Sequence, residues 1–303
     1  MEYFKPYEED VRTVFEEVRA KIGRFPEPFS TLGQQQLEHY DPFKADSAKN
    51  YICYLLPYWM TDAVPLSRKQ AGQLTTAGLF YMLYYFIVDD AMDADREHTG
   101  DLLALGHLFH IESQLLFQEL FPGDSPFWSY MRKYVQEWAV AVVSEKKDDY
   151  FQIDPLLLAR KAAPVKLYST GAMLLTGQPA FIDIAEQWVD RALTVLQMAD
   201  DWQDWREDLE NGSYNSLLSM LGHYEHAQDS DAIMKEIHLH MALDRFLERL
   251  ALWPPLPSSA LKLPYLSTFS ETIVNQLVNT AARIRERKAD LLAGGLHHYL
   301  KHN

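Results

Sequence analysis

The residues best suited to chemistry are two clusters of aspartates, each placed where an apolar helical stretch becomes acidic. In the first cluster, Asp89, Asp90, Asp93 and Asp95 follow a strongly apolar run. On a helix, Asp89 and Asp93 lie one turn apart on one face, where like charges are destabilising. Negative charge is also disfavoured by the helix dipole near a C-terminal end. Two unfavourable terms at one place indicate a bound cation, and a solvated acidic helix end is the alternative.

The second cluster is a stripe of aspartates spaced by four, Asp200, Asp204 and Asp208. The stripe has no lysine or arginine at i+4 to pair with, as a solvated acidic face would have. Carboxylate oxygens in the absence of cysteine ligands favour Mg²⁺ or Mn²⁺ over zinc or copper. Because Mg²⁺ is usually held by one or two carboxylates plus substrate phosphates, the two clusters together predict several Mg²⁺ ions around one diphosphate.

The elements that must position these clusters are helices. Apolar residues recur at helical spacing along the chain, as Val11, Phe15, Val18 and Ile22 do, and alternating strand patterns are absent. Long helices are predicted over residues 66–92, 101–121, 125–147, 180–210 and 265–292. Proline and glycine fall mostly between them, and residues 253–259 are the only linker-like segment. The pattern predicts one all-helical domain over residues 1–303.

Composition excludes several classes of function. Lys plus Arg is 28 and Asp plus Glu is 43, so the net charge of −15 argues against nucleic-acid partners and anionic membrane surfaces. The single cysteine, Cys53, excludes a disulfide scaffold and a cysteine-rich zinc site. The N-terminus has no secretory signal, and the apolar stretch over residues 79–88 is too short to span a bilayer. A cytoplasmic protein without a membrane span is expected.

Aromatic residues make up 13% of the chain and gather in two places. Tyr51, Tyr54, Tyr58 and Trp59 form one group, and a second group occupies residues 80–86. One interpretation is a core of large side chains. The other is an aromatic-walled cavity for an apolar or cationic ligand, because ring faces attract cations. The residues alone leave both open.

The paired acidic motifs resemble those of the class I isoprenoid synthases, which include terpene cyclases, prenyl chain-elongating enzymes and squalene/phytoene synthases. Residues 89–93 match the DDxxD motif of this superfamily, and the 200–208 stripe matches the spacing of its second motif. The resemblance extends over residues 66–220. It implies an all-α helical bundle with a central apolar cavity, several Mg²⁺ ions (with Mn²⁺ as an alternative) and a prenyl diphosphate substrate.

The resemblance also implies roles for individual residues. The catalytic set would be Asp89, Asp93 and Asp204, and the metal ligands would be Asp89, Asp90, Asp93, Asp200, Asp204 and Asp208. Lys166, Lys161 and Arg96 would bind the diphosphate, with both lysines expected on the helix that leads to residues 168–177. Phe86, Tyr85 and Gly171 would line the cavity. Gly171 and Gly177 interrupt an apolar helix, either to open this cavity or to let helices pack closely.

Each branch of the superfamily is imperfectly matched. The Arg-Arg pair that usually follows the first motif of elongating enzymes is missing, which favours ionisation and cyclisation of one prenyl diphosphate. A prenyltransferase that joins units head-to-tail or head-to-head is the alternative, and Glu207, Asp208 and Gly212 resemble the phytoene-type motif. A non-catalytic helical protein that binds a lipid is a further alternative. A homodimer is compatible with each.

Overall fold

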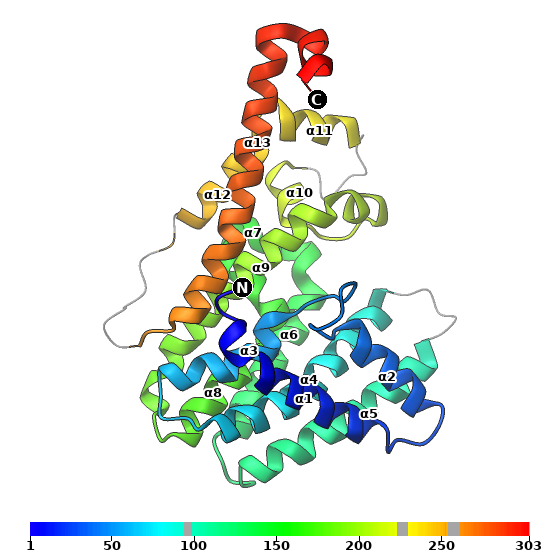
Figure 1. The fold of residues 1–303 in the computed structure, drawn as a ribbon, viewed down its shortest axis with the longest axis vertical. Helices are drawn as coiled ribbons and strands as arrows, with labels where there is room; N and C mark the ends of the chain where they lie inside the picture. The colour runs from blue at the N-terminus through cyan, green and yellow to red at the C-terminus, as the bar shows by residue number, and fades with distance from the viewer. Residues whose placement is uncertain (94–98, 223–229, 252, 254–260, 303) are drawn as a thin grey trace. The chain divides into compact units, whose positions relative to one another are not determined.

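The computed structural model describes residues 1–93, 99–222, 230–251, 253 and 261–302, and these residues are helical with no strand among them (Figure 1). The prediction of an all-α fold is confirmed. The α-helices are α1 (Glu8–Ile22), α2 (Phe29–His39), α3 (Tyr51–Trp59), α4 (Arg68–Asp93), α5 (Thr99–Leu120), α6 (Phe127–Asp148), α7 (Tyr150–Ile153), α8 (Lys166–Leu175), α9 (Ile182–Asn211), α10 (Ser216–Met220), α11 (Ser230–His238), α12 (Ala242–Ala251) and α13 (Pro264–His302). The 3₁₀ helices are η1 (Lys5–Tyr7), η2 (Met60–Asp62), η3 (Pro155–Val165) and η4 (Pro179–Phe181).

The five long helices predicted from spacing are present, as α4, α5, α6, α9 and α13. The apolar face proposed for the first helix is also correct, because Val11, Phe15, Val18 and Ile22 of α1 are all buried. α13 continues to His302, ten residues beyond the predicted end at 292 (302 − 292 = 10).

The chain forms two compact units. Unit 1 consists of Met1–Val135, Pro164–Val189 and Pro257–Leu266, and unit 2 of Gln136–Ala163, Asp190–Leu256 and Ser267–Asn303. Both units are built from three separate segments, so no single cut in the chain divides them. The prediction of one domain over residues 1–303 stays a prediction, and the two units are described in turn.

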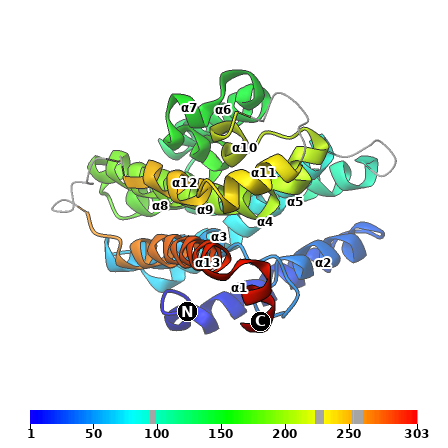
Figure 2. The ribbon, with the colours of Figure 1, turned by 90° about the horizontal axis from the view of Figure 1, so that it is seen from above.

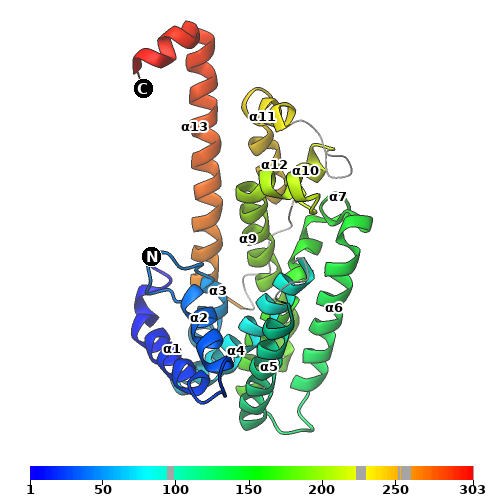
Figure 3. The same ribbon diagram turned by 90° about the vertical axis from the view of Figure 1, so that its right-hand side faces the viewer.

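Unit 1 is organised around α4, which packs most extensively against α5 and also against α1, α3 and α8 (Figure 3). Over Arg68–Met92, α4 is long and apolar enough to cross a membrane, longer than the 79–88 stretch read from the sequence. However, 72% of the apolar 18-residue stretch of α4 is buried inside the protein, as in the core helix of a globular domain. The described helices therefore give no indication of a membrane span.

Most of the clustered aromatic residues belong to the unit 1 core. Tyr54, Tyr58, Trp59, Phe80 and Tyr81 are each at most 2% exposed. Their polar atoms have partners: the Tyr54 hydroxyl donates to the Tyr40 carbonyl (2.9 Å) and the Trp59 indole donates to the Tyr3 carbonyl (2.9 Å). Buried aromatic residues with satisfied polar atoms are typical of a core. The core interpretation is correct for these five, whereas Tyr51, Tyr84 and Phe86 stay partly exposed.

Unit 2 contains the C-terminal part of α9 and the shorter helices that follow it. α11 and α12 pack against each other (Figure 2). The long α13 is joined to α12, since Arg285 pairs with Asp244 at 2.9 Å, and to the turn after α11, since the Lys288 ammonium donates to the Leu239 carbonyl at 2.7 Å. The second acidic motif lies on α9 within this unit, and the first lies on α4 within unit 1.

Candidate functional site

The first acidic motif occupies the last turns of α4, at the helix end where the sequence placed it. Asp89 is half-buried and Asp90 is exposed. Asp93 is the last residue of α4, but its side chain and the whole of Arg96 lie outside the described residues. The roles expected of Asp93 and Arg96 therefore stay predictions.

Tyrosines surround this helix end. The Tyr40 ring lies 4.6 Å from the Phe86 ring, centroid to centroid, and the Tyr85 hydroxyl is 3.3 Å from that of Tyr81. Burial, reinforced by the charges of Asp90 and Asp89, raises the pKa of Tyr40 well above its ordinary value. Tyr40 was not predicted, because it follows α2, far from the motif in sequence.

The second acidic motif lies along α9, where Asp200 and Asp204 are exposed and Asp208 is half-buried. No described residue forms a hydrogen bond with the carboxylates of Asp200 or Asp204. Desolvation, together with repulsion from Asp201 and Asp204, raises the pKa of Asp200 to about 7, and Lys161 opposes the shift. Although Asp200 is exposed by surface area, protein atoms crowd its carboxylate, so it is desolvated without being sealed from solvent. This is the electrostatic setting in which a cation would be stabilising.

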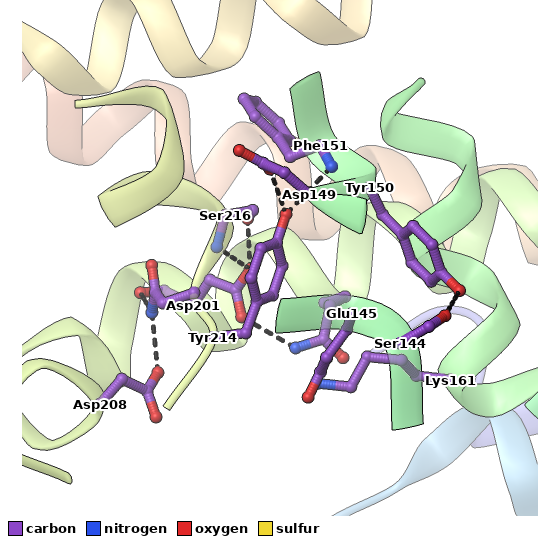
Figure 4. A network of polar contacts seen from close by, with 12 residues as sticks. Ser144, Glu145, Asp149, Tyr150, Phe151, Lys161, Asp201, Asp208, Tyr214 and Ser216 are labelled. Carbon is purple, nitrogen blue, oxygen red and sulfur yellow. Dashed lines mark hydrogen bonds and ion pairs between the residues drawn. The ribbon is translucent and has the colours of Figure 1, made fainter. Parts of the chain in front are cut away.

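Asp201, which lies next to the stripe in sequence but is not part of it, accepts the most hydrogen bonds of the carboxylates in this motif (Figure 4). It is 4% exposed, and its two oxygens accept hydrogen bonds from the Ser216 backbone N–H (2.9 Å), the Ser216 hydroxyl and the Gln197 amide (2.8 Å). Burial raises the pKa of Asp201, and the bonds from Ser216 and Gln197 oppose that shift. A buried carboxylate with this many donors anchors structure rather than binding metal.

Asp149 forms hydrogen bonds with the segment that follows α9, residues 214–219. One Asp149 carboxylate oxygen accepts from the Tyr214 hydroxyl (2.9 Å) and the Ser219 hydroxyl (2.6 Å). The Tyr214 oxygen in turn accepts from the Phe151 backbone N–H at 3.0 Å (Figure 4). Asp149 was not predicted, because no spacing pattern could have paired it with residues 65 and 70 positions later.

The two candidate diphosphate-binding lysines do not share a helix, contrary to the prediction. Lys161 lies on η3 in unit 2, and Lys166 begins α8 in unit 1, with a non-helical residue, Ala162, between them. The Lys161 ammonium pairs with Glu145 at 2.7 Å. Burial raises the pKa values of Asp200, Asp201 and Asp208, and the charge of Lys161 opposes each rise. Lys166 is 3% exposed, with its ammonium 5.1 Å from the centre of the Tyr134 ring. Lys161 thus acts as a counter-ion of the second motif.

Of the two glycines expected to interrupt a helix, only Gly177 does so. Gly177 has φ +67°, and the Gln178 N–H bonds the Met173 carbonyl at 2.8 Å, the Schellman pattern that ends a helix. Gly171 lies inside the unbroken α8, where an added Cβ would lie 3.0 Å from Leu74 and 3.2 Å from Phe121. Gly171 therefore allows close helix packing, the second of the two interpretations offered by the sequence.

The donor set of the acidic motifs fits Mg²⁺ or Mn²⁺ in its chemistry. Within the described residues, which leave out the Asp93 side chain, no three His, Cys, Asp or Glu side chains gather closely enough to hold a metal by themselves. Mg²⁺ needs no such cage, since it keeps waters and is commonly bound by one or two carboxylates plus substrate phosphates. Asp200, Asp204 and one oxygen of Asp208 are the acceptors of the second motif without a hydrogen bond from the described residues.

Comparison with known proteins leaves the superfamily resemblance untested. No family model matches the chain, and no curated protein is significantly similar to it. The function is therefore inferred from the residues and the geometry of the two motifs.

Proposed function

We propose that this protein is a Mg²⁺-dependent class I terpene synthase that ionises and cyclises a linear prenyl diphosphate and releases diphosphate. The observation that carries the proposal is the second motif, where Asp200 and Asp204 share a helix face with no hydrogen bond from the described residues. A carboxylate pair whose repulsion and desolvation raise the pKa of Asp200 to about 7 is the kind of site that a divalent cation stabilises.

Each group of residues has a proposed role in this reaction. Bound Mg²⁺ supplies charge neutralisation that lets the allylic C–O bond of the substrate ionise. Asp89, Asp90 and Asp93 of the first motif and Asp200, Asp204 and Asp208 of the second would hold the metal. Asp201 and Ser216 keep α9 in place, and Lys161 limits the repulsion within the second motif. Partly exposed aromatic residues such as Tyr84 and Phe86 would stabilise a carbocation through their ring faces.

The test is incubation of the purified protein with C10, C15, C20 and C25 prenyl diphosphates and Mg²⁺, followed by analysis of volatile and non-volatile products. We expect a cyclic hydrocarbon or alcohol with one substrate, and no product when EDTA exceeds the metal. Full turnover in excess EDTA would contradict the metal role. Failure to consume any of the four substrates would favour the non-catalytic lipid-binding alternative.

Substitutions locate the activity in the motifs. Asp204→Asn and Asp89→Asn are each expected to lower turnover by about 100-fold or more, since a metal ligand contributes several kcal/mol in the transition state. The melting temperature should hold or rise slightly, because relief of like-charge repulsion on a helix is worth a few tenths of a kcal/mol. Glu210→Gln, which removes an exposed charge of α9 off the stripe, is the matched control. A sharp fall in melting temperature would instead make the aspartates structural partners.

A further inference from the structure

We propose that Asn215 is a positioning residue for the second motif, which fixes the orientation of the Asp208 carboxylate as a metal ligand by a hydrogen bond to one of its oxygens. The inference rests on the proposed function, because it takes Asp208 to be a metal ligand. Asn215 is fully buried at the start of α10, and it lies outside the motif in sequence.

Every hydrogen-bonding group of the Asn215 side chain is used. Its amide nitrogen donates to Asp208 Oδ2 at 2.7 Å and to the Asp201 carbonyl at 2.8 Å. Its amide oxygen accepts from the backbone N–H groups of Leu217 (3.0 Å) and Leu218 (3.1 Å), which caps α10. An amide has two N–H donors and two acceptor lone pairs, so this set is complete. A flipped amide would put N–H groups against N–H groups, so the nitrogen must face Asp208.

The geometry of α9 explains why one amide reaches two of its residues. Asp201 and Asp208 are seven positions apart, two turns along one face. Helical carbonyls point toward the C-terminus, while side chains lean back toward the N-terminus, so the Asp201 carbonyl and the Asp208 carboxylate approach each other. Asn215 fills the gap between them. The hydrogen bond to Asp208 Oδ2 thereby fixes the orientation of the carboxylate, while Oδ1 has no hydrogen bond from the described part of the chain.

Asparagine is the residue type that this double task requires. Serine and glycine can cap a helix N-terminus, but neither carries an amide that could donate to Asp208. Asn215→Ser therefore keeps the cap of α10 and removes the two donors. A helix-capping role alone predicts little change in metal binding, whereas a positioning role predicts a weaker metal site. Outer-shell partners of metal ligands typically contribute 10- to 100-fold in metal affinity.

The test measures Mn²⁺ binding to the purified protein with inorganic pyrophosphate, from the difference in the electron paramagnetic resonance signal of free Mn²⁺ between samples with and without protein at the same pyrophosphate concentration. Asn215→Ser is expected to raise the Mn²⁺ dissociation constant about tenfold or more. Tyr214→Phe is the matched control, because this neighbouring substitution removes a hydrogen bond to Asp149 and leaves the Asn215 amide in place. Its Mn²⁺ dissociation constant should stay within about twofold of wild type, even though its melting temperature falls. If Asn215→Ser does not fold, Asn215→Gly serves instead.

A double substitution separates positioning from any direct role. In an Asp208→Ala background, Asn215→Ser should weaken Mn²⁺ binding no further, because Asn215 acts through Asp208. Equal Mn²⁺ affinity in wild type and Asn215→Ser would overturn the positioning role and leave the proposed function standing. Additive losses in the double variant would also overturn it. Absence of saturable Mn²⁺ binding in wild type would instead remove the metal-dependent function, and the positioning role with it.

Discussion

At the scale of single residues, the neighbouring aspartates Asp200 and Asp201 at the start of the second motif differ in their surroundings and in their proposed roles. Asp200 is exposed and carries no hydrogen bond from the described residues, while Asp201 is buried and accepts three. Helical geometry separates them by about 100°, so one faces solvent and the other faces α10. One carboxylate is thus available for a ligand, and the other secures the helix that presents it.

The pH dependence of stability should reveal Asp200 in metal-free protein. Its pKa is about 7 when folded and about 3.9 in an unfolded chain, so the folded state holds more protons between these values. The contribution of Asp200 to the free energy of unfolding therefore falls as pH rises from about 4 to 7, and this loss is complete above the folded pKa. Asp200→Asn removes this loss, and solvent screening of the exposed side chain limits the gain to about 1 kcal/mol.

Thermal unfolding in EDTA from pH 4.5 to pH 8 measures this effect. At pH 8, Asp200→Asn should melt about 2 °C above wild type, with the difference shrinking toward pH 4. Glu210→Gln controls for the loss of one negative charge from the same helix. A difference that does not vary with pH would show that Asp200 ionises at its ordinary pKa.

Residue types and spacing predicted the two motifs but not the residues that form hydrogen bonds with them or with the segment after α9. Asp200, Asp204 and Asp208 were found because one helix sets their spacing, and α9 indeed carries all three. Asn215, Ser216 and Asp149 were missed because their partnerships depend on how separate helices pack. The only local signal was Asn215, an asparagine directly before a short apolar run, which is a typical N-cap. Such a signal predicts a helix start and says nothing of Asp208.

At the scale of elements, α4 is positioned by a contact that only glycine allows. The Tyr168 ring of α8 lies directly over Gly78, where an added Cβ would be 2.3 Å from a ring carbon. The Tyr168 hydroxyl donates to the Gly78 carbonyl at 2.7 Å, and the tyrosine is 1% exposed. The apolar periodicity of α4 predicted a helix here, but the need for glycine arises from α8, which is remote in sequence.

Gly78→Ala should destabilise the protein by about 3 kcal/mol, since the alanine methyl must displace a buried ring in a packed core. Gly100→Ala is the control, because the position beside this glycine of α5 is open. That variant should be neutral or stabler by up to about 1 kcal/mol, as alanine is the better helix former. Urea unfolding of both variants measures the difference. Equal stabilities would mean that Tyr168 moves aside without cost.

At the scale of the whole molecule, charge argues for a single diphosphate substrate. The net charge of −15 makes a second anion site hard to supply, and Lys161 is already paired with Glu145. Unpaired buried phosphate charge is too costly to accommodate without cationic donors. The homodimer, the cytoplasmic location and the central apolar cavity stay predictions from the sequence.

Radiolabelled isopentenyl diphosphate, supplied with each allylic substrate and Mg²⁺, tests this inference. We expect the label to remain unincorporated and the rate of product formation to be unchanged. Label in a longer prenyl product would overturn the cyclase assignment in favour of a head-to-tail transferase. Coupling of two allylic diphosphates without isopentenyl diphosphate would place the protein in the head-to-head branch.

During translation, the last segments of unit 1 are synthesised long after its first segment. Residues up to Val135 leave the ribosome first, yet α8 and the start of α13 belong to the same unit and follow much later. At typical rates of about 5–20 residues per second, the nascent chain spends roughly ten seconds with the side of α4 that packs against α8 uncovered. Exposed apolar helix surface on a growing chain attracts other unfolded chains. The interval before α8 emerges is therefore the stage of synthesis at which we expect this chain to be most prone to aggregation.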